Sequence, residues 1–225
     1  MIGLSISLLV IIVLGIIGYK FNEADWGHWA TNILDGWIRI YCRYYHRQYQ
    51  HSVHIPVEPH VILAANHVSG IDPFLMITAT DRPIRFMIAK EEYEKPVLNW
   101  MFRAAGCIPV DRSGRVEKAF RSALRAIQAG ELVALFPQGG IHRPDEPRVT
   151  TKPGIVRLAQ LSQCPIYAIR INGVGAPGTI LSSVFKRSNI TFDTHELISV
   201  EQASRPEFRQ NFADWLLGDR EEIHE

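Results

Sequence analysis

The sequence predicts an α/β protein with a mostly parallel central sheet flanked by helices, preceded by an N-terminal membrane helix and an amphipathic helix. Short apolar runs alternate with helical segments from residue 60 onward, which is typical of buried strands and crossover helices. Ahead of them lie an uncharged run at residues 2–19 and an aromatic-rich segment at residues 26–49. We therefore divide the 225-residue chain into a membrane anchor (1–20), an amphipathic interfacial helix (21–56) and an α/β domain (57–225).

The uncharged N-terminal run is long enough to reach across a bilayer. As a helix, residues 2–19 would extend about 27 Å, close to the thickness of the hydrocarbon core. A cleavable signal peptide and a buried core helix are the alternatives, but no Lys or Arg precedes the run and no A-x-A pattern follows it. Basic residues come only afterwards (Lys20, Arg39, Arg43, Arg47), so the positive-inside bias predicts a single span with the domain on the cytoplasmic face.

The segment at residues 26–49 has helical periodicity and one aromatic-rich face. The residues of that face recur at three- and four-residue steps: Trp26, Trp29, Ile33, Trp37, Ile40 and Tyr44. Arg39, Arg43 and Arg47 run beside them at steps of four. Such a helix can lie at a bilayer interface with its arginines reaching lipid phosphates, or it can pack on the α/β domain, and the pattern leaves both open.

The α/β domain is predicted from its apolar runs. Strands are expected at residues 61–65, 84–89, 107–110, 132–136, 166–171 and 190–192, the last of which could be antiparallel. The clearest helix spans residues 116–128, where apolar side chains share one face and basic ones lie elsewhere. A closing helix is expected after Ser204, because Ser204 and Glu207 have the spacing of a capping box.

Composition excludes several classes of protein. At 47% apolar and 21% charged residues the chain can bury a core, so intrinsic disorder is excluded. A net charge of +1 gives no surplus that would favour nucleic acid as a partner. Cys42, Cys107 and Cys164 cannot all pair and show no metal-ligand spacing. We therefore expect a reducing compartment, with neither a disulfide scaffold nor a metal site.

A candidate catalytic pair follows the first predicted strand. His67 and Asp72 lie five residues apart across a turn that contains Gly70, so their side chains can meet when the chain folds back. A carboxylate would orient the imidazole and stabilise its protonated form, leaving the second ring nitrogen to take a proton from a substrate hydroxyl. The alternative is structural, because Asp72 followed by Pro73 also has the pattern of a helix N-terminus.

Two further strand ends carry candidate anion-binding groups. Arg112 follows the third predicted strand, where open α/β sheets bind ligands, although it could equally be a solvated surface arginine. Gly139 and Gly140 follow the fourth, where their N–H groups could hold a phosphate or an oxyanion, or simply form a tight turn. The loop after them adds positive charge through Arg143, Arg148 and Lys152.

The order of these blocks resembles one family. His-x-x-x-x-Asp at residues 67–72, Gly-x-Ile-x-Val-x-Arg at 106–112 and Phe-Pro-x-Gly at 136–139 resemble the motifs of glycerolipid acyltransferases of the PlsC type, the 1-acylglycerol-3-phosphate acyltransferases. The segments at residues 87–91 and 152–159 are also similar to the linking segments of that family. The resemblance covers residues 57–175, about half of the chain.

The resemblance implies transfer of a fatty acyl chain from acyl-CoA or acyl carrier protein to a membrane lipid hydroxyl, without a cofactor or a metal. It implies that His67 is the general base, that Asp72 orients it, and that Arg112 contacts the acceptor phosphate. Gln138, Gly139 and Gly140 would shape the acceptor pocket. Asn66, Arg143 and Lys152 complete the substrate-binding set that we predict.

The chain departs from the family pattern on the acceptor side. The family usually has Glu after Phe-Pro and then Gly-Thr-Arg, whereas this chain has Gln138, Gly140 and Ile141 at the changed positions. Arg143 could substitute for the absent arginine. These differences leave three functions open: acylation of 1-acylglycerol-3-phosphate, the same chemistry on a glycolipid or aminolipid, and a non-catalytic lipid-binding scaffold.

Overall fold

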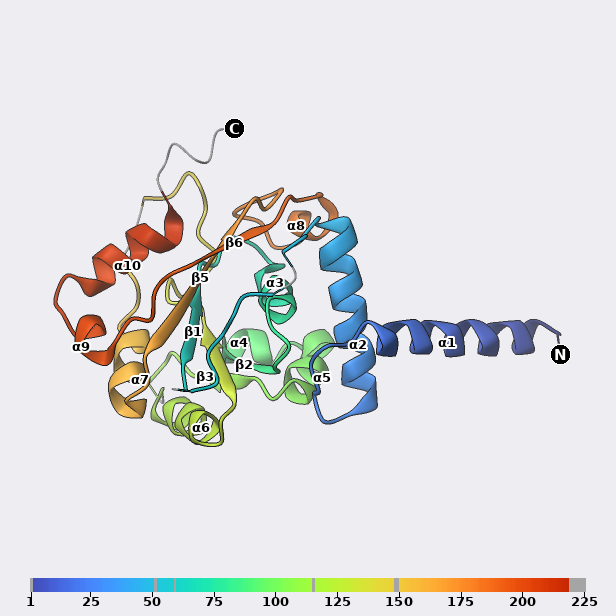
Figure 1. Ribbon diagram of the computed structural model, residues 1–225, viewed down its shortest axis with the longest axis horizontal. Coiled ribbons are helices and arrows are strands. Elements are labelled where there is room, and N and C mark those ends of the chain that lie inside the picture. The colour runs from blue at the N-terminus through green and yellow to red at the C-terminus, as the bar shows by residue number, and fades with distance from the viewer. Residues whose placement is uncertain (1, 51, 59, 115, 148–149, 219–225) are drawn as a thin grey trace.

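A computed structural model describes residues 2–50, 52–58, 60–114, 116–147 and 150–218, and Figure 1 shows its ribbon. Within these residues the strands form a six-stranded sheet in the order β3-β2-β4-β1-β5-β6. The strands are β1 (Ile62–Ala65), β2 (Ile84–Ala89), β3 (Ile108–Val110), β4 (Leu132–Leu135), β5 (Ile166–Asn172) and β6 (Thr191–Thr194).

The sheet is parallel except at one edge, as predicted. β1 pairs in parallel with β4 and β5, β2 pairs in parallel with β4 and β3, and β6 runs antiparallel to β5. The carboxyl ends of β1 and β4 therefore lie side by side at the same edge of the sheet. Residues that follow these two strands can meet there, although about 70 positions separate them in the chain.

Helices cover both faces of the sheet (Figure 1). One layer contains α2 (Trp29–Ile40), α3 (Asp72–Thr78) and α5 (Pro96–Ala104), and the opposite layer contains α6 (Val116–Gln128), α7 (Gly154–Ser162), α9 (Val200–Ala203) and α10 (Phe208–Leu217). The remaining helical segments are α1 (Ile2–Lys20), the π-helix η1 (Tyr41–Tyr45), α4 (Lys90–Tyr93) and α8 (Ser182–Phe185).

Alternation along the strands divides the core into two apolar clusters. In β1, Leu63 and Ala65 belong to the cluster under α3, whereas Ile62 and Ala64 belong to the cluster under α6, α7 and α10. All four side chains are fully buried, as expected for a central strand covered on both faces. The core therefore holds β1 rigidly and positions the residues that follow it.

The N-terminal helix α1 projects from the fold and contacts it near its end. Figure 1 shows α1 extending away from α2. Helices α1 and α2 cross at Gly18 and Gly36, where the backbones approach closely: a Cβ on Gly36 would lie 1.7 Å from the Gly18 carbonyl oxygen. The Trp37 indole N–H donates to the carbonyl of Leu14 at 3.2 Å. The last turns of α1 thus pack against α2, and the turns before them are exposed.

A membrane-spanning anchor at residues 1–20 is not supported. Among the residues that the structure describes, no helix combines the length and apolar character needed to cross a bilayer. The cytoplasmic placement of the domain depended on that span and stays a prediction.

The predicted helix at residues 26–49 is shorter than expected and packs on the domain. It comprises α2 and η1, and of the two roles left open for its arginines, Arg39 and Arg43 have the one within the protein. Arg39 is fully buried and bonds to Asp35, while Arg43 forms an ion pair with Glu23 at 2.8 Å. Asp35 lies one helical turn before Arg39, so the spacing was compatible with that pair, but the sequence could not show that both side chains are buried or that Arg43 pairs with Glu23.

The end of the chain folds as two short helices instead of one. The capping box lies at Ser199 and Gln202, at the start of α9, and not at Ser204. The Ser204 hydroxyl instead donates to the carbonyl of Val200 at 2.8 Å, within the last turn of α9. Phe208 and Phe212 of α10 still bury an apolar face, as the periodicity predicted.

Candidate active site

The candidate site forms where β1 and β4 end. Residues 66–72 follow β1, residues 136–142 follow β4, and the two segments contact each other because the strands are neighbours. The His67 backbone N–H donates to Oε1 of Gln138 at 2.5 Å, and the His142 N–H donates to the His67 carbonyl at 2.7 Å. The loop after β4 therefore holds the backbone of His67 on both sides.

His67 and Asp72 form the predicted pair. Nδ1 of His67 lies 2.9 Å from Oδ2 of Asp72. The carboxylate is fully buried and also accepts hydrogen bonds from the Val68 N–H (2.6 Å), the Ser69 N–H (2.8 Å) and the Ser69 hydroxyl. These bonds fix the carboxylate, which in turn orients the imidazole and leaves its Nε2 for chemistry.

The alternative interpretation of Asp72 as a helix cap does not fit the geometry. Asp72 is the first residue of α3, the cap position is Ile71, and no side chain caps the helix there. The carboxylate points back to the turn that precedes it, because its partners are Val68 and Ser69. Asp72 therefore organises the turn that carries His67.

An aromatic ring supports the imidazole from one side. The Phe136 ring stacks on His67 with centroids 4.2 Å apart and planes 18° apart. Phe86 of β2 stacks on Phe136 in turn, at 6.0 Å. The imidazole is thus fixed by a carboxylate at Nδ1 and by a ring against its face, while 19% of its side chain stays exposed. That exposure gives a substrate access to the histidine.

Cationic side chains flank the Gly139 turn. Nη2 of Arg112 donates to the Gly139 carbonyl at 2.9 Å, and the exposed Lys152 lies on the same turn, its stem 3.2 Å from where a Gly139 Cβ would be. Gly139 has φ +80°, a backbone conformation that favours glycine. Its N–H donates to the Phe136 carbonyl at 3.0 Å and closes the turn. Gly140 is exposed with open space around it. The arrangement suits an anionic group beside His67.

The other predicted binding residues lie farther from this turn. The Asn66 amide is buried and bonds to the backbone N–H and carbonyl of Ile171, which gives it a structural role in holding β1 against β5. Arg143 packs on Gly178 with an exposed guanidinium, 4.0 Å from Glu146. Arg148 lies outside the described residues.

Gln138 has an unusual environment. Its Oε1 holds the His67 backbone, but its Nε2 is buried without a hydrogen-bond partner among the described residues. A buried amide donor without a partner costs about 1–3 kcal/mol, so a site that keeps one commonly uses it for a ligand.

The sequence did not reveal three contributors to the site. Ser69 holds the carboxylate, Phe136 supports the imidazole, and His142 fixes the His67 backbone. The Phe-Pro-Gln-Gly block drew attention to Phe136, but its ring contact depends on the strand order, which the sequence alone does not give. Burial raises the pKa of Cys107 to about 11 and that of Cys42 to about 12, which disfavours the thiolate form of both.

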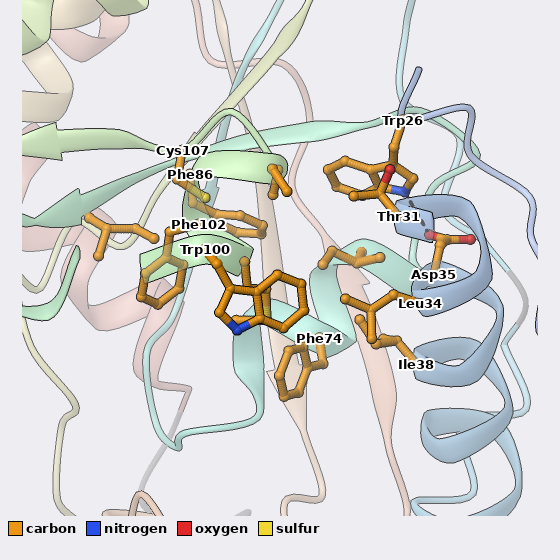
Figure 2. A pocket seen from close by; sticks show the side chains of 15 residues that line it. Trp26, Thr31, Leu34, Asp35, Ile38, Phe74, Phe86, Trp100, Phe102 and Cys107 are labelled. Carbon is orange, nitrogen blue, oxygen red and sulfur yellow. Dashed lines mark hydrogen bonds between the residues drawn. The ribbon is translucent and has the colours of Figure 1, made fainter. Parts of the chain in front are cut away.

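Phe86 also lines an apolar pocket, which Figure 2 shows. Its volume is about 60 Å³, and α2, α3, β2 and α5 all contribute to its walls. Leu34, Phe74, Phe86 and Trp100 point into it from these elements. Phe86 lies between the pocket and the site, because it lines the pocket and its ring stacks on Phe136, which in turn stacks on His67. The lining of the pocket suits an apolar group.

Fold and site together define a mostly parallel α/β protein with a hydrogen-bonded His67–Asp72 pair next to a turn that carries cationic side chains, and with an apolar pocket. The chain belongs to the Acyltransferase family, whose model matches residues 46–172. The family resemblance expected from the three motifs is thereby confirmed.

Relatives with known names are consistent with this assignment. The chain is 29% identical over 132 residues to a probable 1-acyl-sn-glycerol-3-phosphate acyltransferase of Mycoplasma genitalium, covering 53% of this chain and 46% of that protein. It is 22% identical over 141 residues to the 1-acyl-sn-glycerol-3-phosphate acyltransferase of Bacillus subtilis, covering 62% and 65%. An N-acylphosphatidylethanolamine synthase of Arabidopsis thaliana is 25% identical over 119 residues, covering 48% and 41%. Each match spans less than two thirds of the relative's length.

A solved structure shares the fold. The crystal structure of the 1-acyl-sn-glycerophosphate acyltransferase PlsC from Thermotoga maritima superposes with a TM-score of 0.60 at 18% identity, covering 88% of this chain and 81% of that one. At this identity the similarity establishes the architecture, and the substrates have to be argued from the site.

Proposed function

We propose that the protein transfers a fatty acyl chain from acyl-CoA or acyl carrier protein to the free hydroxyl of a lysophospholipid, with 1-acylglycerol-3-phosphate as the default acceptor. The observation that carries this proposal is the His67–Asp72 pair, fixed at 2.9 Å with the second imidazole nitrogen uncommitted. Membership of the Acyltransferase family supports the same reaction class.

The proposed chemistry uses His67 as a general base. Nε2 removes the proton from the acceptor hydroxyl while its oxygen attacks the thioester carbonyl. The new C–O ester bond forms, the C–S bond breaks, and the imidazolium returns its proton to the departing thiolate. Asp72 stabilises the imidazolium through Nδ1 and does not itself take the proton. The nucleophile is the substrate alcohol, so the protein needs no nucleophilic side chain of its own.

The acceptor phosphate is assigned to the Gly139 turn. Arg112 already bonds to this turn, and the exposed Lys152 lies on it. Two cations beside a turn next to the general base suit a phosphate, which accepts charge-assisted hydrogen bonds. A neutral headgroup would leave both cations without an anionic partner.

The acyl chain is assigned to the apolar pocket of Figure 2. Its walls are almost entirely apolar, and the ring of Phe86 connects it with the imidazole through Phe136. A chain bound there would place its thioester end near His67. The dimensions of the pocket would then set the chain length that the protein accepts.

Ala105→Leu is expected to shift the preference toward shorter acyl donors. Ala105 lines the pocket, and each methylene that no longer fits is expected to reduce kcat/KM about 10-fold or more. Competition between donors of different length in one reaction measures the shift. Ala129→Leu, at an exposed position after α6, is the matched control and should keep the original preference. An unchanged length profile in Ala105→Leu would remove the pocket from the proposal.

Membrane association is proposed to come from α1. Its side chains from Ile6 to Leu14 are mostly exposed and apolar, and the helix projects from the domain (Figure 1). Exposed apolar surface of this extent favours lipid over water. Contact with lipid would bring the protein to the surface where a lysophospholipid resides.

An acceptor panel tests the proposed function. Purified full-length protein is incubated with one labelled acyl donor and, in turn, lysophosphatidic acid, other lysophospholipids, a lyso-aminolipid and a glycolipid. We expect ester formation, fastest with lysophosphatidic acid and at least about 100-fold slower in His67→Ala. Faster turnover of an acceptor without a phosphomonoester would favour the second candidate, which the changes at Gln138, Gly140 and Ile141 motivate. No turnover with any acceptor would favour a lipid-binding scaffold.

A further inference from the structure

The segment between β5 and β6 presents an exposed apolar surface. It carries α8, which lies beside one end of α2 in Figure 1. Ile180, Leu181 and Phe185 are 66%, 69% and 71% exposed. Three large apolar side chains so close together on one surface are unusual for a protein in water and mark a contact site.

The segment that carries these side chains is basic in sequence. Residues 173–192 contain Lys186 and Arg187 but no Asp or Glu. The two cations directly follow Phe185, and the Arg187 guanidinium lies 5.5 Å from the centre of the Tyr45 ring. Apolar side chains next to cations, with no acidic residue in the segment, complement an anionic phospholipid surface, where lipid tails and headgroups offer both partners.

The backbone beneath this surface is held by η1. The Tyr41 hydroxyl donates to the Val184 carbonyl and the Tyr45 hydroxyl to the Phe185 carbonyl, both at 2.5 Å. Nδ1 of the buried His46 lies 2.9 Å from the Ser188 hydroxyl. These bonds hold the backbone of α8 while its apolar side chains stay exposed. The exposure is therefore built into the fold.

The same segment contacts the catalytic turn. The Gly70 N–H donates to the Thr179 carbonyl at 3.0 Å, and the Gly178 N–H donates to the Val68 carbonyl at 2.7 Å. Gly70 has no room for a side chain, since a Cβ would lie 2.5 Å from the Ile180 carbonyl oxygen. Ile180 thus sits directly against the turn that joins His67 to Asp72. The exposed side chains therefore belong to a segment whose backbone contacts the turn that carries His67.

We propose that Ile180, Leu181, Phe185, Lys186 and Arg187, which we call the α8 surface, dock onto an anionic phospholipid bilayer and hold the catalytic turn at its surface. This contact is separate from α1, which attaches to the domain through α2. The inference rests on the proposed function in one respect, because it explains how an acceptor still in the bilayer would reach His67. The lipid contact itself does not require catalysis.

A polarity-sensitive fluorophore reports this contact in the full chain. It is attached through Leu181→Cys in a Cys164→Ser background, since Cys42 and Cys107 are buried. Leu161→Cys, half-exposed on α7 in the opposite helix layer, is the matched control. With phosphatidylcholine vesicles containing phosphatidylglycerol, we expect a several-fold rise in emission at position 181 and none at 161. Equal responses at the two positions, or none at 181, would overturn the proposal.

The charge component has its own test. Lys186→Gln with Arg187→Gln is expected to weaken the vesicle-induced response about 30-fold on anionic vesicles and not on pure phosphatidylcholine. An unchanged response on anionic vesicles would overturn the assignment of these cations. Emission at position 181 that rises with protein concentration in the absence of vesicles would indicate that a second copy of the chain binds the α8 surface. That result would overturn the bilayer as its partner.

Activity separates this proposal from the proposed function. Ile180→Ser with Leu181→Ser and Phe185→Ser should slow turnover of an acceptor embedded in vesicles at least about tenfold, while a short-chain acceptor dissolved as monomers is turned over at the unaltered rate. An equal loss of turnover rate on both acceptors, in a variant that folds, would overturn the α8 surface as a bilayer contact. If the triple variant does not fold, Phe185→Ser alone is tested in the same way. If the unaltered protein acylates nothing but position 181 still enters vesicles, the proposed function fails and the α8 surface stands.

Discussion

His67→Ala is expected to lower kcat about 10²- to 10⁴-fold with little change in the KM for the acyl donor, because a positioned general base contributes that much to a proton transfer. The side chain is partly exposed, so its removal should leave the melting temperature close to that of the unaltered protein. Initial rates with labelled donor and thermal unfolding of the same preparation measure the two effects. A variant that keeps full activity would exclude His67 as the base.

Asp72→Asn tests the role of the carboxylate through the same rate measurement. The amide has the shape of the carboxylate, but it carries no charge to stabilise an imidazolium at Nδ1. We expect a loss of rate approaching that of His67→Ala, and the double variant should be little worse than either single one because the two groups act as a unit. Asp81→Asn, at an exposed carboxylate after α3, is the control and should retain its rate. Additive losses in the double variant would show that the two residues act independently.

Much of the fold could be predicted because local pattern and tertiary environment agree. Strand β2 and helix α6 have the predicted bounds, 84–89 and 116–128. The apolar run of β1 is buried on both faces, which is the environment that such a run indicates. The pairing of His67 with Asp72 could also be predicted, because the two residues lie in one short turn.

The contacts that could not be predicted join segments far apart in the chain. Gln138 holds the His67 backbone across 71 positions, and the Asn66 amide is occupied by Ile171 across 105. Spacing along the chain carries no information on either contact. Arg39 shows the same limit, because its position in a stripe of arginines suggested lipid phosphates, whereas its partners come from α2 itself and from three other segments. Tertiary structure decides whether an arginine is solvated or buried.

The buried Arg39 has a consequence for stability. Its guanidinium donates to Asp35 at 2.6 Å, to Glu23 at 2.8 Å and to the carbonyls of Ile77 (3.2 Å) and Thr80 (2.8 Å). It therefore joins α2 to the end of α3 and to the turn after it. Asp35 is buried as well and accepts from the indole N–H of Trp26 at 3.1 Å. Removing the cation would leave a buried carboxylate without its counterion.

Arg39→Met is expected to lower the free energy of unfolding by about 3–5 kcal/mol, since breaking a buried pair strands the remaining charge. For a chain of this size that corresponds to a fall in melting temperature of roughly 6–20 °C. Arg39→Met combined with Asp35→Leu should recover part of the loss, because the double variant buries no unpaired charge. Arg121→Met, on the exposed face of α6, is the control and should melt like the unaltered protein. If Arg39→Met melts like that control, the buried pair does not hold α2 to the domain, and the wall that α2 gives the apolar pocket must be held by other contacts.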